Sequence, residues 1–172
     1  MIVKGNRQMQ QIVLVEDTRQ QANRHDLKHE YFAKKGIRVV RSKLFVGDYS
    51  LLTDMSVCVD TKYSISELYS DMYHSHERFR NEADRAMANG IRLFILVENT
   101  QGVKSVDDVI RWENPQFSKK TPKNKKRPVP NDQFVKALKT FSKRHGAIIR
   151  FVSPENSGRA VMYLLTGKDW GE

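Results

Sequence analysis

The fold of this chain is decided by the stretch VCVDTK at residues 57–62. It belongs to the run at 56–62, which is predicted as the second strand of a hairpin, and successive side chains of a strand point to opposite faces. Asp60 and Lys62 therefore share one face. The other residues of the strand are expected on the opposite face: Val57, Val59 and Thr61. An acid and a base thus lie side by side on one surface.

The residues before this strand predict its partner. Residues 44–52 contain a second strand-like run, and a turn at 53–55 joins this run to the strand at 56–62 as a hairpin. The partner carries Asp48 in the sequence GDY at 47–49. Asp48 and Asp60 are therefore expected on adjacent strands.

Strands and helices alternate along the rest of the chain. Ser64 and Glu67 form a capping box that predicts a helix at 64–74. The apolar run at 91–97 follows two predicted helices, which indicates a crossover to a parallel neighbour. The first helix, at 19–35 with Gly36 as its stop, is expected to bury Ala22, Leu27, Tyr31 and Phe32. The remaining expected elements are strands at 11–15, 38–41 and 147–152 and helices at 75–89, 105–112, 131–145 and 156–165.

This order of elements predicts an α/β fold with a mixed central sheet flanked by helices. A chain of 172 residues is long enough for one well-buried core and too short for two ordinary domains. We therefore expect residues 1–172 to form a single domain.

The charge of the chain favours a polyanionic partner. The formal net charge is +10, which suits nucleic acid. We expect a basic, mobile loop at about 116–130 that contacts phosphates without choosing a sequence, and a solvated loop without such contacts is the alternative. Its cations are Lys119, Lys120, Lys123, Lys125, Lys126 and Arg127.

The single cysteine, Cys58, leaves no internal disulfide and no multi-cysteine zinc cluster. This usage favours an intracellular compartment, the cytoplasm for a bacterial or phage protein and the nucleus for a eukaryotic one. No stretch approaches the roughly 20 apolar residues of a membrane span, so no membrane partner is expected.

Three acids stand at or next to the ends of strand-like runs: Asp17, Asp48 and Asp60. Hard oxygen ligands of this kind hold Mg²⁺ or Mn²⁺, and such an ion supports phosphodiester hydrolysis. Lys62 could position the attacking water or neutralise charge on the phosphate. Each acid alone also has an ordinary interpretation: a helix cap for Asp17, a turn residue for Asp48 and a cross-strand ion pair for Asp60.

Together these motifs resemble the nuclease domain of XPF-type structure-specific endonucleases, which belong to the PD-(D/E)XK superfamily of restriction-like nucleases. The family pattern is an Asp-x-Arg-Glu after the first strand, a Gly-Asp, and a Glu-Arg-Lys with an Asp a few residues on. The matching segments are EDTRQ at 16–20, VGDY at 46–49, VDTK at 59–62 and SISEL at 64–68. The resemblance covers about residues 12–97 and implies a restriction-endonuclease-like sheet.

The resemblance also implies roles for single residues. It makes Lys62 the catalytic lysine, and magnesium, with manganese as a substitute, the cofactor held by Asp17, Asp48 and Asp60. Arg19 matches the family's first arginine, and Glu67 approximates its trailing acid. Two further accessory residues resemble the arginine and the acid of a helix near the family's active site, although they also fit an ordinary i, i+4 pair: Arg78 and Glu82.

The chain departs from the family pattern at three positions. Asp60 replaces the usual Glu, a change that the wider superfamily tolerates. Thr61 and Gln20 stand where the family has Arg and Glu, which concerns substrate positioning more than metal binding. The family's helix-hairpin-helix module, which binds DNA and often mediates dimerisation, is not seen, so we expect a monomer or a homodimer that pairs through the nuclease domain.

The expected function is that of a magnesium-dependent endonuclease that hydrolyses DNA phosphodiester bonds. Branched or flapped DNA in recombination or repair is the candidate substrate, and RNA stays open. The alternative is a non-catalytic nucleic-acid-binding subunit with a nuclease-like fold, which the missing Arg and Glu of the motifs would fit.

Overall fold

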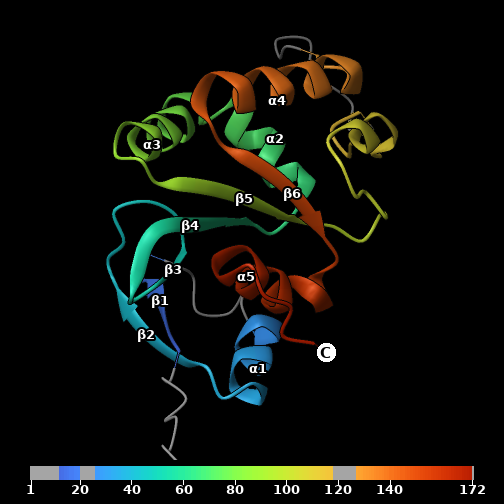
Figure 1. Cartoon of the computed structure of the whole chain (residues 1–172). Coiled ribbons are helices and arrows are strands. Elements are labelled where there is room, and N and C mark those ends of the chain that lie inside the picture. The colour runs from blue at the N-terminus through green and yellow to red at the C-terminus, as the bar shows by residue number, and fades with distance from the viewer. Residues whose placement is uncertain (1–11, 20–25, 118–126, 172) are drawn as a thin grey trace, which may run out of the picture.

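The structure is a computed structural model that describes residues 12–19, 26–117 and 127–171. These residues form a six-stranded mixed sheet with helices on both faces (Figure 1). The expected α/β fold with one mixed central sheet is confirmed. None of the helices in the described part is long and apolar enough to cross a membrane.

The strands follow one direction with a single exception. They are β1 (Val13–Asp17), β2 (Arg38–Ser42), β3 (Tyr49–Leu51), β4 (Asp54–Lys62), β5 (Arg92–Glu98) and β6 (Ile148–Val152), in the spatial order β2-β1-β3-β4-β5-β6. Only β3 runs antiparallel to its neighbours. The five parallel strands, β1, β2, β4, β5 and β6, therefore end at one edge of the sheet, and β3 begins there. Open α/β sheets place their sites at such an edge.

The helices form two layers (Figure 1). One face is covered by α2 (Ile65–Tyr73), α3 (His76–Ala88) and α4 (Asn131–His145), and the other by α1 (Asp26–Lys34) and α5 (Ser157–Thr166). Two short 3-10 helices complete the chain, η1 (Asp107–Arg111) and η2 (Pro154–Asn156). Each layer encloses its own apolar core, and β5 contributes to both, with Ile95 on one side and Leu96 on the other.

Local sequence explains where the helices begin and end. Ser64 caps α2, because its Oγ accepts a hydrogen bond from the backbone N–H of Glu67 at 3.1 Å. The buried side chains of α4 recur at helical spacing, and the helix ends at Gly146 in the left-handed conformation, φ +67°. These two helices lie where the sequence predicts them.

Two expectations are wrong. Residues 44–48 are not a strand, because the backbone N–H of Leu44 bonds to the Asp17 carboxylate and Gly47 turns the chain with φ +72°. In α1, Leu27 is 51% exposed, whereas Lys28 is buried. The helix is rotated toward Lys28 because that side chain forms an ion pair with buried Glu98 at the end of β5. Phe32 is buried as expected, and Ala22 lies outside the described residues.

Candidate active site

The site is a cavity of about 290 Å³ at the edge where β1 and β4 end and β3 begins. We call it the Lys62 cavity. All of the acidic, lysine and accessory residues that the sequence singles out line it: Asp17, Asp48, Asp60, Lys62, Arg19, Glu67, Arg78 and Glu82. The sequence-based grouping of these residues thus corresponds to one place in the fold.

Asp17 lies at the end of β1 and is held from two sides. Arg19 donates from its backbone N and its Nε to Oδ1 at 2.7 and 2.8 Å, and from Nη2 to Oδ2 at 2.9 Å. The backbone N–H of Leu44 adds a bond to Oδ2 at 2.7 Å. Burial alone would raise the pKa of Asp17, but the bonds from Arg19 and Leu44 lower it. The carboxylate is therefore ionised and paired.

Asp48 immediately precedes β3 and is fixed to both neighbouring strands. Its backbone N–H donates to Val59 O at 2.8 Å, and its carbonyl accepts from Asp17 N at 2.8 Å. Its Oδ2 accepts from the backbone N and the hydroxyl of Thr61, both at 2.7 Å. Thr61 was expected to point away from Asp60 and Lys62, yet its hydroxyl reaches Asp48 because Asp48 extends over the end of β4. The threonine orients this acid.

Lys62 lies between two buried acids. Its Nζ is 2.8 Å from Asp60 Oδ2 and 2.9 Å from Oδ2 of Asp71 on α2. The three side chains are each no more than 8% exposed. The same Nζ lies 5.1 Å from the centre of the Phe79 ring. A single lysine thus forms ion pairs with two carboxylates and lies beside the ring of Phe79.

Burial and neighbouring charges shift the pKa of Asp60 and the pKa of Lys62. Burial raises the pKa of Asp60, an effect that Lys62 opposes and that Asp48 and Glu82 reinforce. Burial alone would lower the pKa of Lys62, but Asp60 and Asp71 together raise it. Both pKa values are raised, because Lys62 has two acidic partners whereas Asp60 is buried and also faces further acids. Asp60 is therefore the partner whose ionised form is disfavoured, and Lys62 is the partner whose charged form is favoured.

The two accessory residues of α3 do not pair with each other in the contacts that the structure shows. Arg78 Nη2 lies 3.5 Å from Asp71 Oδ1. Glu82 Oε1 instead accepts a hydrogen bond from the backbone N–H of Gly47 at 3.0 Å. The geometry favours a role in the cavity over the ordinary i, i+4 pair, because each residue contacts another element and both line the cavity.

The remaining predicted residues lie at or beyond the rim. Glu67 accepts a hydrogen bond from the backbone N–H of Tyr63 at 2.7 Å. Arg127 is exposed and is not among the residues that line the Lys62 cavity. The other cations of the predicted basic loop lie outside the described residues: Lys119, Lys120, Lys123, Lys125 and Lys126.

Sequence reasoning missed Asp71 and the pair of Lys28 and Glu98. Asp71 had a signal, since it is an acid on the buried face of α2 among Leu68 and Met72. Glu98 also had one, because it follows an apolar strand as Asp17 does. For Lys28 the sequence gives no comparable signal that its side chain is buried.

The donor set fits a hard divalent cation in its chemistry. Two buried carboxylate oxygens, Oδ2 of Asp60 and Oδ2 of Asp71, accept no hydrogen bond of good geometry, although each lies at ion-pair distance from Lys62. Among the residues that the structure describes, no three acidic, histidine or cysteine side chains form a ready metal cage. At Asp17 both carboxylate oxygens are paired with Arg19. An ion held by these acids would have to exchange with that guanidinium.

Comparison with protein families gives one match that spans most of the chain. The family model described as the ERCC4 domain matches residues 16–164. No curated protein is detectably similar to the chain.

Comparison with solved structures shows the same fold. The chain is similar to XPF from Aeropyrum pernix, with 17% identity and a TM-score of 0.58 over 89% of this chain and 63% of that one. A second structure of that protein, in complex with DNA, matches with 16% identity and a TM-score of 0.58 over 90% of this chain and 64% of that one. This chain therefore spans less than two thirds of the solved chains.

Proposed function

This chain belongs to the ERCC4 domain family, and we propose that it is a magnesium-dependent endonuclease that hydrolyses DNA phosphodiester bonds. The observation that carries the proposal is the Lys62 cavity, in which three acids and a buried lysine meet: Asp17 from β1, Asp48 from just before β3, and Asp60 and Lys62 from β4. Carboxylates and a lysine in one cavity are the groups that metal-assisted hydrolysis of a phosphodiester requires.

In this proposal the acids hold the metal. Asp17, Asp48 and Asp60 would supply the oxygen ligands of Mg²⁺, and the chemistry that this ion would supply there is polarisation of the phosphoryl oxygen and activation of water. Burial and the nearby acids raise the pKa of Asp60, and a metal cation beside it would favour the ionised carboxylate that serves as a ligand. Manganese would substitute, because it takes the same oxygen ligands.

Lys62 supplies a fixed positive charge. Because its pKa is raised, it stays protonated and acts as a hydrogen-bond donor to the phosphate rather than as a general base. Asp60 and Asp71 hold its ammonium group in place, so little reorganisation is needed when negative charge develops on the phosphate.

Two exposed arginines extend this positive charge to the rim. The side chains of Arg19 and Arg78 are 57% and 80% exposed, and both line the cavity. They are placed to contact phosphates on either side of the scissile one. The six cations of residues 119–127 would add contacts that depend on salt and not on sequence.

DNA is the proposed substrate, with branched or flapped forms in recombination or repair as the candidates. The similar XPF structure was solved in complex with DNA, which supports this choice over RNA. The similarity to the XPF structures is a similarity of fold. The preference for a particular DNA structure is therefore part of the proposal.

A non-catalytic nucleic-acid-binding subunit is the second candidate. The observation that favours it is the pairing of both Asp17 oxygens with Arg19, which leaves the acids without a ready metal cage. In that case the same cavity would bind phosphate through Arg19 and Lys62 alone.

A cleavage assay with a matched pair of variants tests the proposal. Linear, flapped and branched DNA are incubated with Mg²⁺ or Mn²⁺, and Asp60→Ala is compared with Asp54→Ala, an exposed acid on the same strand. Cleavage that Asp60→Ala abolishes and Asp54→Ala retains supports the enzyme. Intact DNA under all these conditions, with no heat of Mn²⁺ binding in calorimetry, contradicts it and favours the binding subunit.

A further inference from the structure

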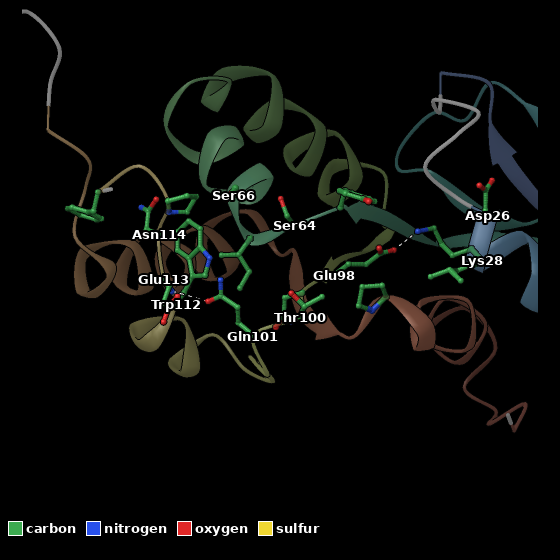
Figure 2. A pocket seen from close by; sticks show the side chains of 17 residues that line it. Asp26, Lys28, Ser64, Ser66, Glu98, Thr100, Gln101, Trp112, Glu113 and Asn114 are labelled. Atoms are coloured by element: carbon green, nitrogen blue, oxygen red, sulfur yellow. Dashed lines mark hydrogen bonds and ion pairs between the residues drawn. The ribbon is translucent and has the colours of Figure 1, made fainter. Parts of the chain in front are cut away.

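A second cavity, of about 960 Å³, lies beside the Lys62 cavity. Figure 2 shows the side chains that line this second cavity. Lys28 and Tyr63 line both cavities, and Tyr63 directly follows Lys62 in the chain. Asn99, after β5, and Pro154, after β6, also line it, so it lies at the same edge of the sheet. Neighbouring nucleotides of one strand could therefore reach the two cavities together.

We propose that this second cavity, here named the base pocket, binds one unpaired nucleobase of the strand whose phosphate lies in the Lys62 cavity. The inference rests on the proposed function. It adds a subsite that makes cleavage depend on the base next to the scissile phosphate. The pocket is large enough for this role, since small-molecule sites measure about 300–1,000 Å³.

The walls of the base pocket offer flat, apolar surfaces. Trp112 lines it and is 5% exposed, whereas Tyr63 and Phe117 are 57% and 53% exposed. Two prolines, Pro115 and Pro154, add further flat surfaces. Bases stack on aromatic side chains of this kind, and extruded bases are bound between aromatic or apolar side chains.

The polar groups of the pocket suit the edge of a base. Gln101, Glu113 and Asn114 line it and offer both donors and acceptors, which the Watson–Crick edge of a base requires (Figure 2). Asn114 is 6% exposed, and its buried Nδ2 has no hydrogen-bond partner among the described residues. A buried donor without a partner is costly, so a ligand acceptor at this amide would stabilise the site.

The charge of the pocket argues against a phosphate. The positive charge of Lys28 is already paired with Glu98, which also accepts a hydrogen bond from Ser157 at 2.6 Å. Two further acids, Asp26 and Glu113, line the same cavity. A neutral base fits these surroundings, whereas a dianionic group would be repelled.

Contacts within the protein hold the walls of the base pocket in place. The backbone N–H of Glu113 donates to Gln101 Oε1 at 3.0 Å, and Asn131 Nδ2 donates to Trp112 O at 2.6 Å. The Trp112 ring packs against Tyr69 at 5.8 Å between ring centres. A site held in this way loses little conformational entropy on binding.

Fluorescence of Trp112 tests base binding directly, without metal or cleavage. The chain has two tryptophans, and Trp170→Phe leaves Trp112 as the single reporter. In that background, 2′-deoxyadenosine is expected to quench the emission in a saturable manner, whereas 2-deoxyribose 5-phosphate, which lacks a base, leaves it unchanged. No quenching by the nucleoside, or equal quenching by both probes, overturns the inference.

A matched pair of exposed aromatic residues locates the bound base. Phe117→Ala is expected to weaken nucleoside binding about fivefold or more, the low end of what one stacking contact contributes. Tyr163→Ala removes a similarly exposed ring, 54% against 53%, that lies outside both cavities, and is expected to change nothing. Equal binding by the two variants overturns the inference.

Cleavage separates a failure of the pocket from a failure of the proposed enzyme. Each nucleotide near the cut is replaced in turn by an abasic residue. One position is expected to slow cleavage at least fivefold in the native protein and much less in Phe117→Ala. Equal rates at every position overturn the base pocket and leave the endonuclease intact. Quenching by the nucleoside without cleavage of any DNA contradicts the endonuclease and leaves base binding standing.

Discussion

Lys62 on β4 and Asp71 on α2 form a buried ion pair of 2.9 Å, although eight residues, including the start of a helix, lie between them in the chain. The same ammonium group lies 2.8 Å from Asp60. Asp71 therefore holds the lysine from behind while Asp60 faces the cavity. We assign Asp71 the role of a positioning residue, and its contribution can be measured.

Asp71→Asn is expected to lower the cleavage rate about 10–100-fold, which is typical for the loss of a group that orients a metal-site residue. Binding of Mn²⁺ measured by calorimetry should change much less, because Asp71 is not among the proposed ligands. Asp132→Asn, at an exposed acid paired with Lys136, serves as the control. An unchanged cleavage rate in Asp71→Asn would show that Asp60 alone positions Lys62.

Asp60→Asn is expected to stabilise the metal-free protein at neutral and alkaline pH. Because the folded-state pKa of Asp60 is raised above its ordinary 3.8, the folded form binds the proton more tightly than the unfolded form does. Stability is therefore lost as the pH rises from about 3.8 through the raised folded pKa, with a slope of at most about 1.4 kcal/mol for each pH unit. Asp60→Asn has no carboxyl group at this position, so its stability does not fall with pH in this way.

Thermal unfolding of the metal-free protein between pH 5 and pH 8 measures this difference. The gain from Asp60→Asn should grow with pH, and added Mn²⁺ should stabilise the native protein but not the variant. Asp54→Asn is the control, since the pKa of that exposed acid is lowered, and its titration falls below this range. A gain that does not depend on pH would contradict the raised pKa of Asp60.

Arg19→Ala is expected to tighten Mn²⁺ binding severalfold and to weaken DNA binding. The guanidinium occupies both oxygens of Asp17, so its removal frees a ligand and also removes a rim cation. Calorimetry measures the first effect, and a DNA-binding titration measures the second. Arg41→Ala, which removes a cation paired with Glu16, is the control. Weaker Mn²⁺ binding in Arg19→Ala would show that the arginine supports the site rather than competing for it.

Gly47→Ala is expected to destabilise the fold by about 1–3 kcal/mol and to lower activity. Its φ is +72°, and an added Cβ would lie 3.1 Å from Val59 O and 3.2 Å from Cys58 Cβ, so the segment that carries Asp48 must shift. Gly90→Ala has a similar φ of +66° with no atom within 4 Å and isolates the cost of the backbone conformation. Equal losses in the two variants would mean that the close contact at Gly47 contributes nothing.

Neutralising the basic stretch is expected to weaken DNA binding at every sequence and to flatten its dependence on salt. Each phosphate contact that is lost should reduce the slope of log K against log salt by about 0.9 for duplex DNA. The measurement is a binding titration at several salt concentrations, with these residues changed to Gln: Lys119, Lys120, Lys123, Lys125, Lys126 and Arg127. An unchanged slope would place the phosphate contacts elsewhere.

The parts of the fold that follow from short-range patterns were predictable. The helix at 131–145 and the parallel pairing of β4 with β5 follow from apolar spacing and from a crossover of two helices. The stretch at 44–48 was predicted as a strand because its apolar residues permit one. Long-range bonds, from Leu44 to Asp17 and from Gly47 to Glu82, determine its actual path.

The candidate site shows the same division. The acids and Lys62 were predicted because strand ends and alternation bring them to one edge. Asp71 was missed because helical spacing places it on the buried face of α2 but does not show that its partner is Lys62 on β4. The pairing of Arg19 with Asp17 was also invisible, since the sequence shows that they are neighbours but not which way the guanidinium turns.

The two cavities are built largely from consecutive parts of the chain. The residues of the Lys62 cavity lie within residues 17–82, whereas most of the walls of the base pocket come from residues 98–117 and Pro154. Changes in the later segment can therefore alter which base is accepted without disturbing the groups that hold the phosphate. Proteins with this architecture can change which base they accept through substitutions in residues 98–117. Exchanging this segment between relatives is a direct route to enzymes that select another base.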